Sequence, residues 1–252
     1  MMIGLLGKKL GMTHTYDEHG RRMAVTAIQA GPCTILQLRE PGKHGYGAVQ
    51  LGFEPIAETK LTKPAAGQFK KLRLAPFRYT RELRLPAAQS NGEQELKAGQ
   101  QLTVDLFQEY ELVDISGISI GKGFQGGMKR WGWHGGGETH GSMSHRAPGS
   151  IGSTTTPGRV FRGHHLPGHM GDRRTTIQHV RIVGIYPEKN VLLLEGSVPG
   201  ADNELIAVTK SIKRPGAMRK PQAILNIVDE DDENLSKTAK AAKKKLPTKP
   251  AA

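Results

Sequence analysis

Residues 121–174 hold the candidate functional side chains of this sequence, and the types of these side chains favour binding over catalysis. This stretch contains both tryptophans of the chain, many histidines, lysines and arginines, and only two acids, Glu138 and Asp172. Cations neutralise phosphates, aromatic rings stack on bases, and glycines let a backbone approach closely. We therefore predict an RNA-penetrating arm. Its predicted RNA-binding residues are Lys122, Phe124, Lys129, Arg130, Trp131, Trp133, His134, His140, His145, Arg146, Arg159, Arg162, His164, His165, His169, Arg173 and Arg174.

The histidines of this stretch also suggest a metal site, which the spacing does not favour. His165 and His169 would share a face of a helix, but Pro167 and Gly168 lie between them. No glutamate occupies the position of a zinc-protease general base. We predict no metal, and a metal hydrolase is the enzyme-class alternative.

Other catalytic motifs fail for similar reasons. The residues 121–126 match G-x-G-x-x-G, but the glycine-rich run that follows predicts no helix and therefore no dinucleotide site. Serine, histidine and aspartate are present without the rigid frame that a hydrolase needs. We predict no catalytic residue, no cofactor and no small-molecule substrate.

The two tryptophans have two interpretations. In an extended chain Trp131 and Trp133 point to the same side. Burial in a core is one role for them, and stacking on RNA bases is the other. The neighbouring Lys129, Arg130 and His134 favour stacking or cation–π contact.

The segments before and after residues 121–174 are predicted to form short strands. Apolar, β-branched runs separated by turn residues occupy 2–54, and strand character returns at QLTVDLF and ELVDISGISI. After the stretch, TIQHVRIVGIYPEKNVLLLEG predicts a hairpin, and ELIAVTKSI predicts a last strand. A barrel or sandwich is expected, and strands on both sides make the arm an excursion from one β-domain.

The predicted domain organisation follows these runs. A surface segment, 56–99, is inserted in the β-domain and opens with a helix from Lys63-Pro64 to Leu72. An acidic block followed by an Ala/Lys/Pro run predicts a disordered tail. We assign 1–55, 100–120 and 175–214 to the β-barrel, 56–99 to the insert, 121–174 to the arm and 215–252 to the charged tail.

The overall composition narrows the partners. The formal net charge is +13 with a pI near 9.9, which favours a polyanion. No apolar run approaches the roughly 20 residues that span a bilayer, so we expect no membrane partner. No secretory signal is evident, so the protein is expected to stay in the cytoplasm. The single cysteine, Cys33, lies in a predicted strand and is expected to be a buried small hydrophobe.

Several motifs together resemble one family. MIGLLGKKLGMTH, LTKPAAGQFKK, GKGFQGGMKRWGW, THGSMSHRAPGSIGSTTTPGRVF, GHMGDRR and NVLLLEGSVPG are similar, in order over 2–212, to signatures of the large-subunit ribosomal protein L-three family of bacterial type. Lys8 and Lys9, in the first signature, are further predicted RNA contacts.

The resemblance implies a fold and a function. It implies a six-stranded, translation-protein-like β-barrel with an extension threaded into large-subunit (23S) rRNA, early binding during subunit assembly, contacts with neighbouring large-subunit ribosomal proteins, and no chemistry of its own. The tip of the extension, at 148–158, would approach the peptidyl transferase centre of the ribosome. The tip residues are Gly149, Ser150, Ile151, Gly152, Ser153, Thr154, Thr155 and Thr156.

The sequence departs from the family pattern at the tip. Many bacterial members carry a glutamine there that a methyltransferase modifies, and 153–156 contains none. That modification is therefore not expected. The resemblance does not cover the tail. A free nucleic-acid chaperone that uses the same basic arm is the alternative within the binding class.

Overall fold

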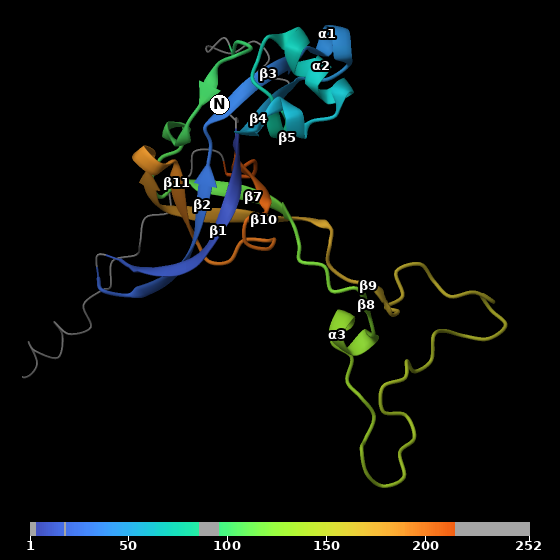
Figure 1. The fold of residues 1–252 in the computed structure, drawn as a ribbon. Helices are drawn as coiled ribbons and strands as arrows, with labels where there is room; N and C mark the ends of the chain where they lie inside the picture. The colour runs from blue at the N-terminus through green and yellow to red at the C-terminus, as the bar shows by residue number, and fades with distance from the viewer. Residues whose placement is uncertain (1–3, 18, 86–95, 215–252) are drawn as a thin grey trace, which may run out of the picture.

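Six antiparallel strands close into a barrel at the centre of the molecule (Figure 1). The computed structural model describes residues 4–17, 19–85 and 96–214. Around the barrel the strand order is β1, β12, β7, β10, β11, β2, so the first and last strands of the described residues are neighbours. The prediction of a mainly β fold with a six-stranded barrel is confirmed. The barrel strands are β1 (Gly4–Tyr16), β2 (Arg22–Ala30), β7 (Leu112–Ile118), β10 (Arg174–Tyr186), β11 (Val191–Glu195) and β12 (Leu205–Lys210).

The barrel interior is filled by the alternate residues of its strands. Leu192 and Leu194 of β11 are fully buried, whereas the residues between and beside them are half-buried. Ile28, Ile115 and Ile206 from three other strands complete this layer with no exposed surface or almost none. The period of two places one face of each strand in the core.

A second sheet stands beside the barrel, and its position corrects the predicted domain boundary. Its strand order is β5, β4, β3, β6. The sequence assigned all of 1–55 to the barrel, but β3 and β4 belong to this other sheet. After β2 the chain turns at Gly31, with φ of 86°, and Pro32, and a strand pattern does not specify which sheet a strand joins. The strands are β3 (Cys33–Arg39), β4 (Ala48–Pro55), β5 (Phe77–Arg84) and β6 (Gln101–Leu102).

The two sheets share one hydrophobic core. Ile35 and Leu51 of the second sheet are fully buried in the same cluster as Leu5 and Ile182 of the barrel. The predicted insert is therefore no separate unit, because its strand β5 pairs with β4 along most of its length. The shared core fixes the second sheet against the barrel.

The predicted helix in the insert is confirmed as α2 (Lys63–Leu72). Pro64 occupies the first turn, and Arg73, with φ of 55°, ends the helix by donating its N–H to the Phe69 and Lys70 carbonyls. Phe69 packs against Phe77 with ring centroids 6.2 Å apart. The shorter helices of the described residues outside the arm are α1 (Pro41–His44), η1 (Glu58–Lys60), η3 (Val104–Leu106) and η4 (Pro187–Lys189).

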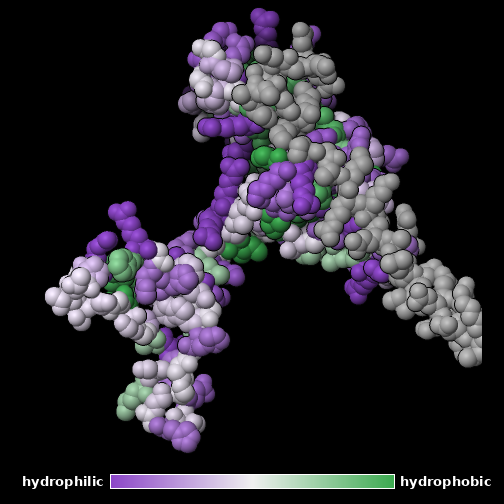
Figure 2. Space-filling view, turned by 180° about the vertical axis from the view of Figure 1, so that it is seen from behind, coloured by the Kyte–Doolittle hydropathy of each residue, from purple (hydrophilic) through white to green (hydrophobic). Residues whose placement is uncertain are grey.

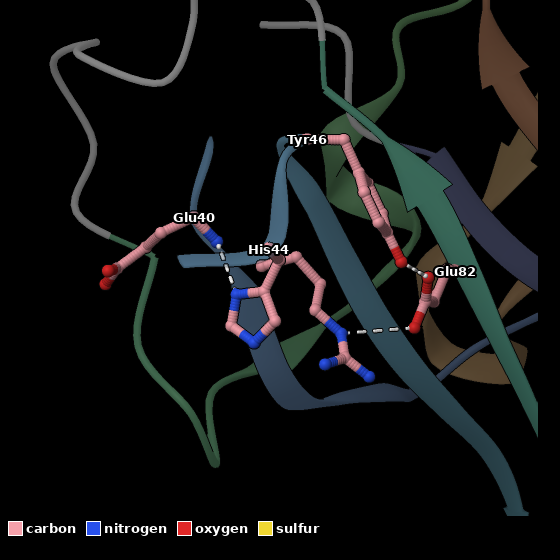
Figure 3. A network of polar contacts seen from close by, with 5 residues as sticks. Glu40, His44, Tyr46 and Glu82 are labelled. Atoms are coloured by element: carbon pink, nitrogen blue, oxygen red, sulfur yellow. Dashed lines mark hydrogen bonds and ion pairs between the residues drawn. The ribbon is translucent and has the colours of Figure 1, made fainter. Parts of the chain in front are cut away.

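A polar network ties the strands of the second sheet together. The Tyr46 hydroxyl donates to the Glu82 carboxylate at 2.8 Å (Figure 3). The Arg39 Nε donates to the other Glu82 oxygen at 3.3 Å. The bond to Glu82 raises the pKa of Tyr46, because it favours the neutral phenol. Across the α1 turn, the Glu40 N–H donates to His44 Nδ1 at 3.3 Å. These contacts stabilise the second sheet and the α1 turn beside it.

The strands on either side of the arm match the sequence prediction. β10 and β11 form the predicted hairpin around η4 and Asn190, whose φ is 51°. β12, the predicted last strand, fills the place between β1 and β7. Because β7 and β10 are paired neighbours, the arm leaves the barrel from two adjacent strands. The predicted C-terminal tail, 215–252, lies outside the described residues.

Candidate nucleic-acid interface

The arm, residues 121–174, leaves the barrel as a continuation of the β7–β10 pair. Arg174 is the register partner of Ile118 at the barrel edge. Beyond it, the Ser119 N–H donates to the Arg173 carbonyl and the Lys122 N–H to the Met170 carbonyl, both at 2.9 Å. The ladder ends in two short strands, β8 (Phe124–Gln125) and β9 (Gly168–His169). We call this ladder, residues 119–125 and 168–173, the neck.

The backbones in the neck approach so closely that one position requires glycine. Gly171 has a φ of 76°, and a Cβ there would lie 2.1 Å from the Ile120 carbonyl oxygen. Both the left-handed backbone and the contact exclude a larger residue. The direction in which the arm leaves the barrel is therefore fixed by main-chain geometry.

A short helix follows β8, where the sequence predicted none. α3 (Gly127–Trp131) is closed by Gly132, whose φ is 71° and whose N–H donates to the Gly127 and Met128 carbonyls. Glycine at this end position terminates a helix without strain, so glycine-rich flanks permit a single turn. At five residues α3 is far shorter than a dinucleotide-binding helix.

Four residues hold α3 to the returning chain, and we call them the clasp: Arg130, Trp131, His165 and Leu166. The Leu166 carbonyl accepts from Arg130 Nη1 at 2.7 Å and from Trp131 Nε1 at 2.9 Å. The Trp131 ring stacks on the His165 ring at a centroid distance of 4.0 Å and an interplanar angle of 5°. Arg130 Cζ lies 5.0 Å from the Trp131 ring centroid. Within this part of the arm, the clasp replaces a hydrophobic core.

The clasp changes the interpretation of the two tryptophans. The sequence favoured stacking on RNA for both indoles, which point to one side in an extended chain, and left burial in a core as the alternative. Trp131 instead ends a helix and has one ring face covered by His165, although 42% of its surface is exposed. Trp133 is half-buried and lies over Gly127, where a Cβ would come within 2.0 Å of its ring. Each indole thus has a structural contact of its own.

Seven of the eight predicted arm cations are exposed. Among the described residues of the arm, no lysine or arginine forms an ion pair, and Arg130 alone is half-buried. Arg159 lies over the Phe161 ring at 5.5 Å. Figure 2 shows the arm in hydrophilic and intermediate colours over most of its surface, with only small hydrophobic patches. The exposed members are Lys122, Lys129, Arg146, Arg159, Arg162, Arg173 and Arg174.

Lys9 corrects one prediction. Its side chain is buried, with 8% of its surface exposed, and Nζ donates to the Val198 carbonyl at 3.1 Å and the Gly200 carbonyl at 2.9 Å. A charge held in this way is not accessible to a phosphate. The reason is its place in β1, which turns alternate residues inward. Lys8 is half-buried on the same strand.

The arm histidines, which all lie within the described range 96–214, have different surroundings, and they form no metal-binding cluster. His165 belongs to the clasp, and His169 lies in β9 opposite Phe124. Over the described ranges, no group of three or more His, Cys, Asp or Glu side chains is placed to hold a metal ion. In the same ranges no helix is long and apolar enough to cross a membrane.

The tip residues are exposed and carry only local contacts. Ser150 Oγ donates to the Gly152 carbonyl at 3.2 Å, and 46% of the Ile151 surface is exposed. The tip begins beside an open cavity of about 670 Å³ that is lined by residues 132–134, 147–150 and 163–165. Neither this cavity nor the Leu166 carbonyl was foreseen from the sequence, because a main-chain acceptor has no residue type that marks it.

A closed barrel that carries a long arm of unpaired cations defines a class of protein suited to a polyanionic partner. The family model of ribosomal protein L3 matches residues 85–187. Similar proteins include the large ribosomal subunit protein uL3 of Brachyspira hyodysenteriae, 45% identical over 213 residues, which are 84% of this chain and 96% of that protein. The uL3 of Gloeobacter violaceus is 48% identical over 217 residues, which are 85% of this chain and 99% of that protein.

The chain belongs to the ribosomal protein L3 (uL3) family. It is a structural constituent of the large ribosomal subunit, and it sits in the ribosome in the cytoplasm. The resemblance read from the sequence motifs is thereby confirmed.

Proposed function

We propose that the arm binds large-subunit (23S) rRNA and that the protein nucleates early assembly of the subunit. The observation that carries this proposal is the set of exposed arm cations without ion pairs. An arm with few acids and no core of its own gains little by folding alone, whereas phosphates neutralise its charge and release counterions. The neck and the clasp fix the positions of the cations nearest the barrel, Lys122, Arg130 and Arg173.

The same proposal assigns two roles within the arm. Arg159 and Arg162 act on phosphates and contribute to affinity. The tip, residues 149–156, carries no charge and contributes shape near the peptidyl transferase centre. Exposed surfaces of the barrel and second sheet contact neighbouring large-subunit proteins. The support for these finer roles is the exposure of the tip and its family resemblance.

Salt-dependent binding to a large-subunit rRNA transcript tests the phosphate role. For Arg159→Ala with Arg162→Ala, the slope of log affinity against log salt should fall by roughly two units, about one for each lost contact. Lys43→Ala, in α1 and far along the chain from the arm, is the control and should keep the slope. An unchanged slope in the double variant would contradict the proposal.

Subunit yield compared with translation activity tests the division of roles. A Thr154→Ala, Thr155→Ala variant should assemble nearly as well as wild type while altering peptide-bond formation. The double arginine variant should lower the yield of subunits. A tip variant that blocks assembly as severely as the arginine variant would contradict this division of roles within the arm. Protein that sediments mostly free of large subunits would instead favour a nucleic-acid chaperone.

A further inference from the structure

The arm has an open cavity, lined by residues 132–134, 147–150 and 163–165, whose volume suits a ligand. Its volume of about 670 Å³ falls within the roughly 300–1,000 Å³ of small-ligand pockets. One wall is built by the chain just after α3, the second by the chain just before the clasp, and the first tip residues lie at the junction. The lining residues are Gly132, Trp133, His134, Ala147, Pro148, Gly149, Ser150, Gly163, His164 and His165.

The lining is rich in flat rings and has no negative charge. Trp133, His134, His164 and His165 supply four planar rings, and none of the described residues that line the cavity is acidic. Glycines in both walls leave room for a ligand to approach the main chain. A cationic ligand is repelled by such a basic arm, whereas a planar ring attached to a phosphate suits both the rings of the lining and the positive charge around it.

His165 joins the cavity to the clasp. One face of its ring is covered by Trp131, which does not line the cavity. His165 therefore presents its other face and its edge to the cavity. A planar group lying against that face would extend the Trp131–His165 stack by one layer. The stack is already held in place by the hydrogen bond from Trp131 Nε1 to the Leu166 carbonyl.

We propose that this cavity binds one unstacked nucleotide of the rRNA, with its base against the free face of His165. His134 and His164 reach the edges of the base or its phosphate, and Trp133 closes the opposite wall. This inference rests on the proposed function, because it specifies how the arm engages RNA. Single-stranded loops and bulges supply such bases, and their stacking on aromatic rings is the usual mode of RNA recognition.

Two variants block or weaken the cavity while leaving the lysines and arginines intact. Gly149→Phe adds a bulky ring at the lining of the cavity, and it does so without a clash, since a Cβ at Gly149 meets nothing within 4 Å and the backbone φ is ordinary. His164→Ala removes one wall. Each has a matched control outside the lining: Gly137→Phe, where the nearest atom to an added Cβ is 3.9 Å away, and His19→Ala, at an exposed histidine of the turn between β1 and β2 that is not among the predicted RNA contacts.

The assay uses the full chain with a large-subunit rRNA transcript. Gly149→Phe and His164→Ala should each weaken binding about tenfold, the effect of one lost base stack, with the salt slope unchanged. The controls should stay within about twofold of wild type. In the complexes, the same one or two unpaired nucleotides should gain reactivity toward base-directed chemical probes in both cavity variants and in neither control.

Cavity variants that bind as wild type, with no nucleotide changing its reactivity, would overturn the proposal. The proposed function would survive that result if Arg159→Ala with Arg162→Ala still lowers the salt slope, and it would fall with wild-type protein that binds rRNA without salt dependence. Large subunits that carry Gly149→Phe, keep normal rRNA reactivity and lack a neighbouring protein would assign the cavity to a peptide instead. That outcome also overturns the nucleotide proposal.

Discussion

Replacing Trp131 with alanine should loosen the arm without weakening the barrel. The substitution removes a hydrogen bond to the Leu166 carbonyl and a ring stack on His165. It also removes the contact with the Arg130 guanidinium. None of these groups belongs to the shared core of the barrel and second sheet. The free energy of unfolding of the barrel should therefore stay close to that of wild type.

The size of the local effect follows from these contacts. A hydrogen bond contributes about 0.5–1.5 kcal/mol, an aromatic stack about 0.5–1.5 kcal/mol, and an exposed cation–π contact about 0.5–1 kcal/mol. Because 42% of Trp131 is exposed, water compensates part of this sum, and we expect a loss of roughly 2 kcal/mol. Opening of the adjoining neck should then become about thirtyfold more frequent, at a factor of ten for each 1.4 kcal/mol.

Amide hydrogen exchange on the isolated full chain measures this opening. The Met170 N–H, bonded to the Gly123 carbonyl at 3.0 Å, should exchange about thirtyfold faster in Trp131→Ala. The barrel amide of Ile182, bonded to the Glu111 carbonyl at 3.0 Å, is the internal control. Trp131→Phe keeps a ring and loses the N–H, so its effect should be intermediate.

One result would contradict the role of Trp131 in the clasp. If Trp131→Ala leaves Met170 exchange within twofold of wild type and yet weakens RNA binding, Trp131 acts by stacking on RNA bases and not through the clasp. The double variant with His165→Ala gives a second check. Residues that act through one stack should show a combined effect smaller than the sum of the single effects.

Two further predictions concern buried groups. Lys9→Ala should lower the free energy of unfolding by about 2–4 kcal/mol, because it leaves the Val198 and Gly200 carbonyls without their charged donor. Lys8→Ala is the control, and thermal or urea unfolding measures both variants. A larger loss of stability in Lys8→Ala than in Lys9→Ala would contradict the assignment. Burial raises the pKa of the Cys33 thiol from 9.0 to about 12, so the neutral thiol is the form that the fold prefers. The stability that the buried neutral thiol contributes is present below pH 9 and is lost as the pH rises toward 12. In urea titrations, the stability advantage of wild type over Cys33→Ala should therefore shrink across that range. A constant difference would show that the thiol does not titrate as described.

The sequence predicted the strands better than their arrangement. The hairpin around η4, the last strand β12 and the helix α2 are visible in local patterns of apolar residues, prolines and turns. Whether β3 and β4 join the barrel depends on how the chain turns at Gly31 and on the partners it meets there. That information lies in long-range packing, because β3 receives β6 from a segment far along the chain.

The candidate site divides in the same way. The exposed cations could be predicted, since charge without nearby acids is a property of composition. Lys9 could not be told apart from Lys8, because burial depends on strand register and on carbonyls contributed by residues 198 and 200. The Trp131 contact could not be predicted either, because its main acceptor is a main-chain oxygen 35 residues away.

The neck explains how an arm with little core of its own keeps a defined direction. Its cations repel one another, and charge alone would favour many extended conformations. The ladder from Ser119 to Met170 continues the β7–β10 pair, and Gly171 permits the close approach of its two strands. The clasp adds side-chain contacts just beyond. Ordering the arm therefore costs less free energy at the moment of binding. This pre-organisation is largest near the barrel, where Arg173 and Arg174 lie, and smallest toward the tip, whose contacts are local. An rRNA partner should accordingly order the loops beyond the clasp while leaving the neck as it is in the free protein.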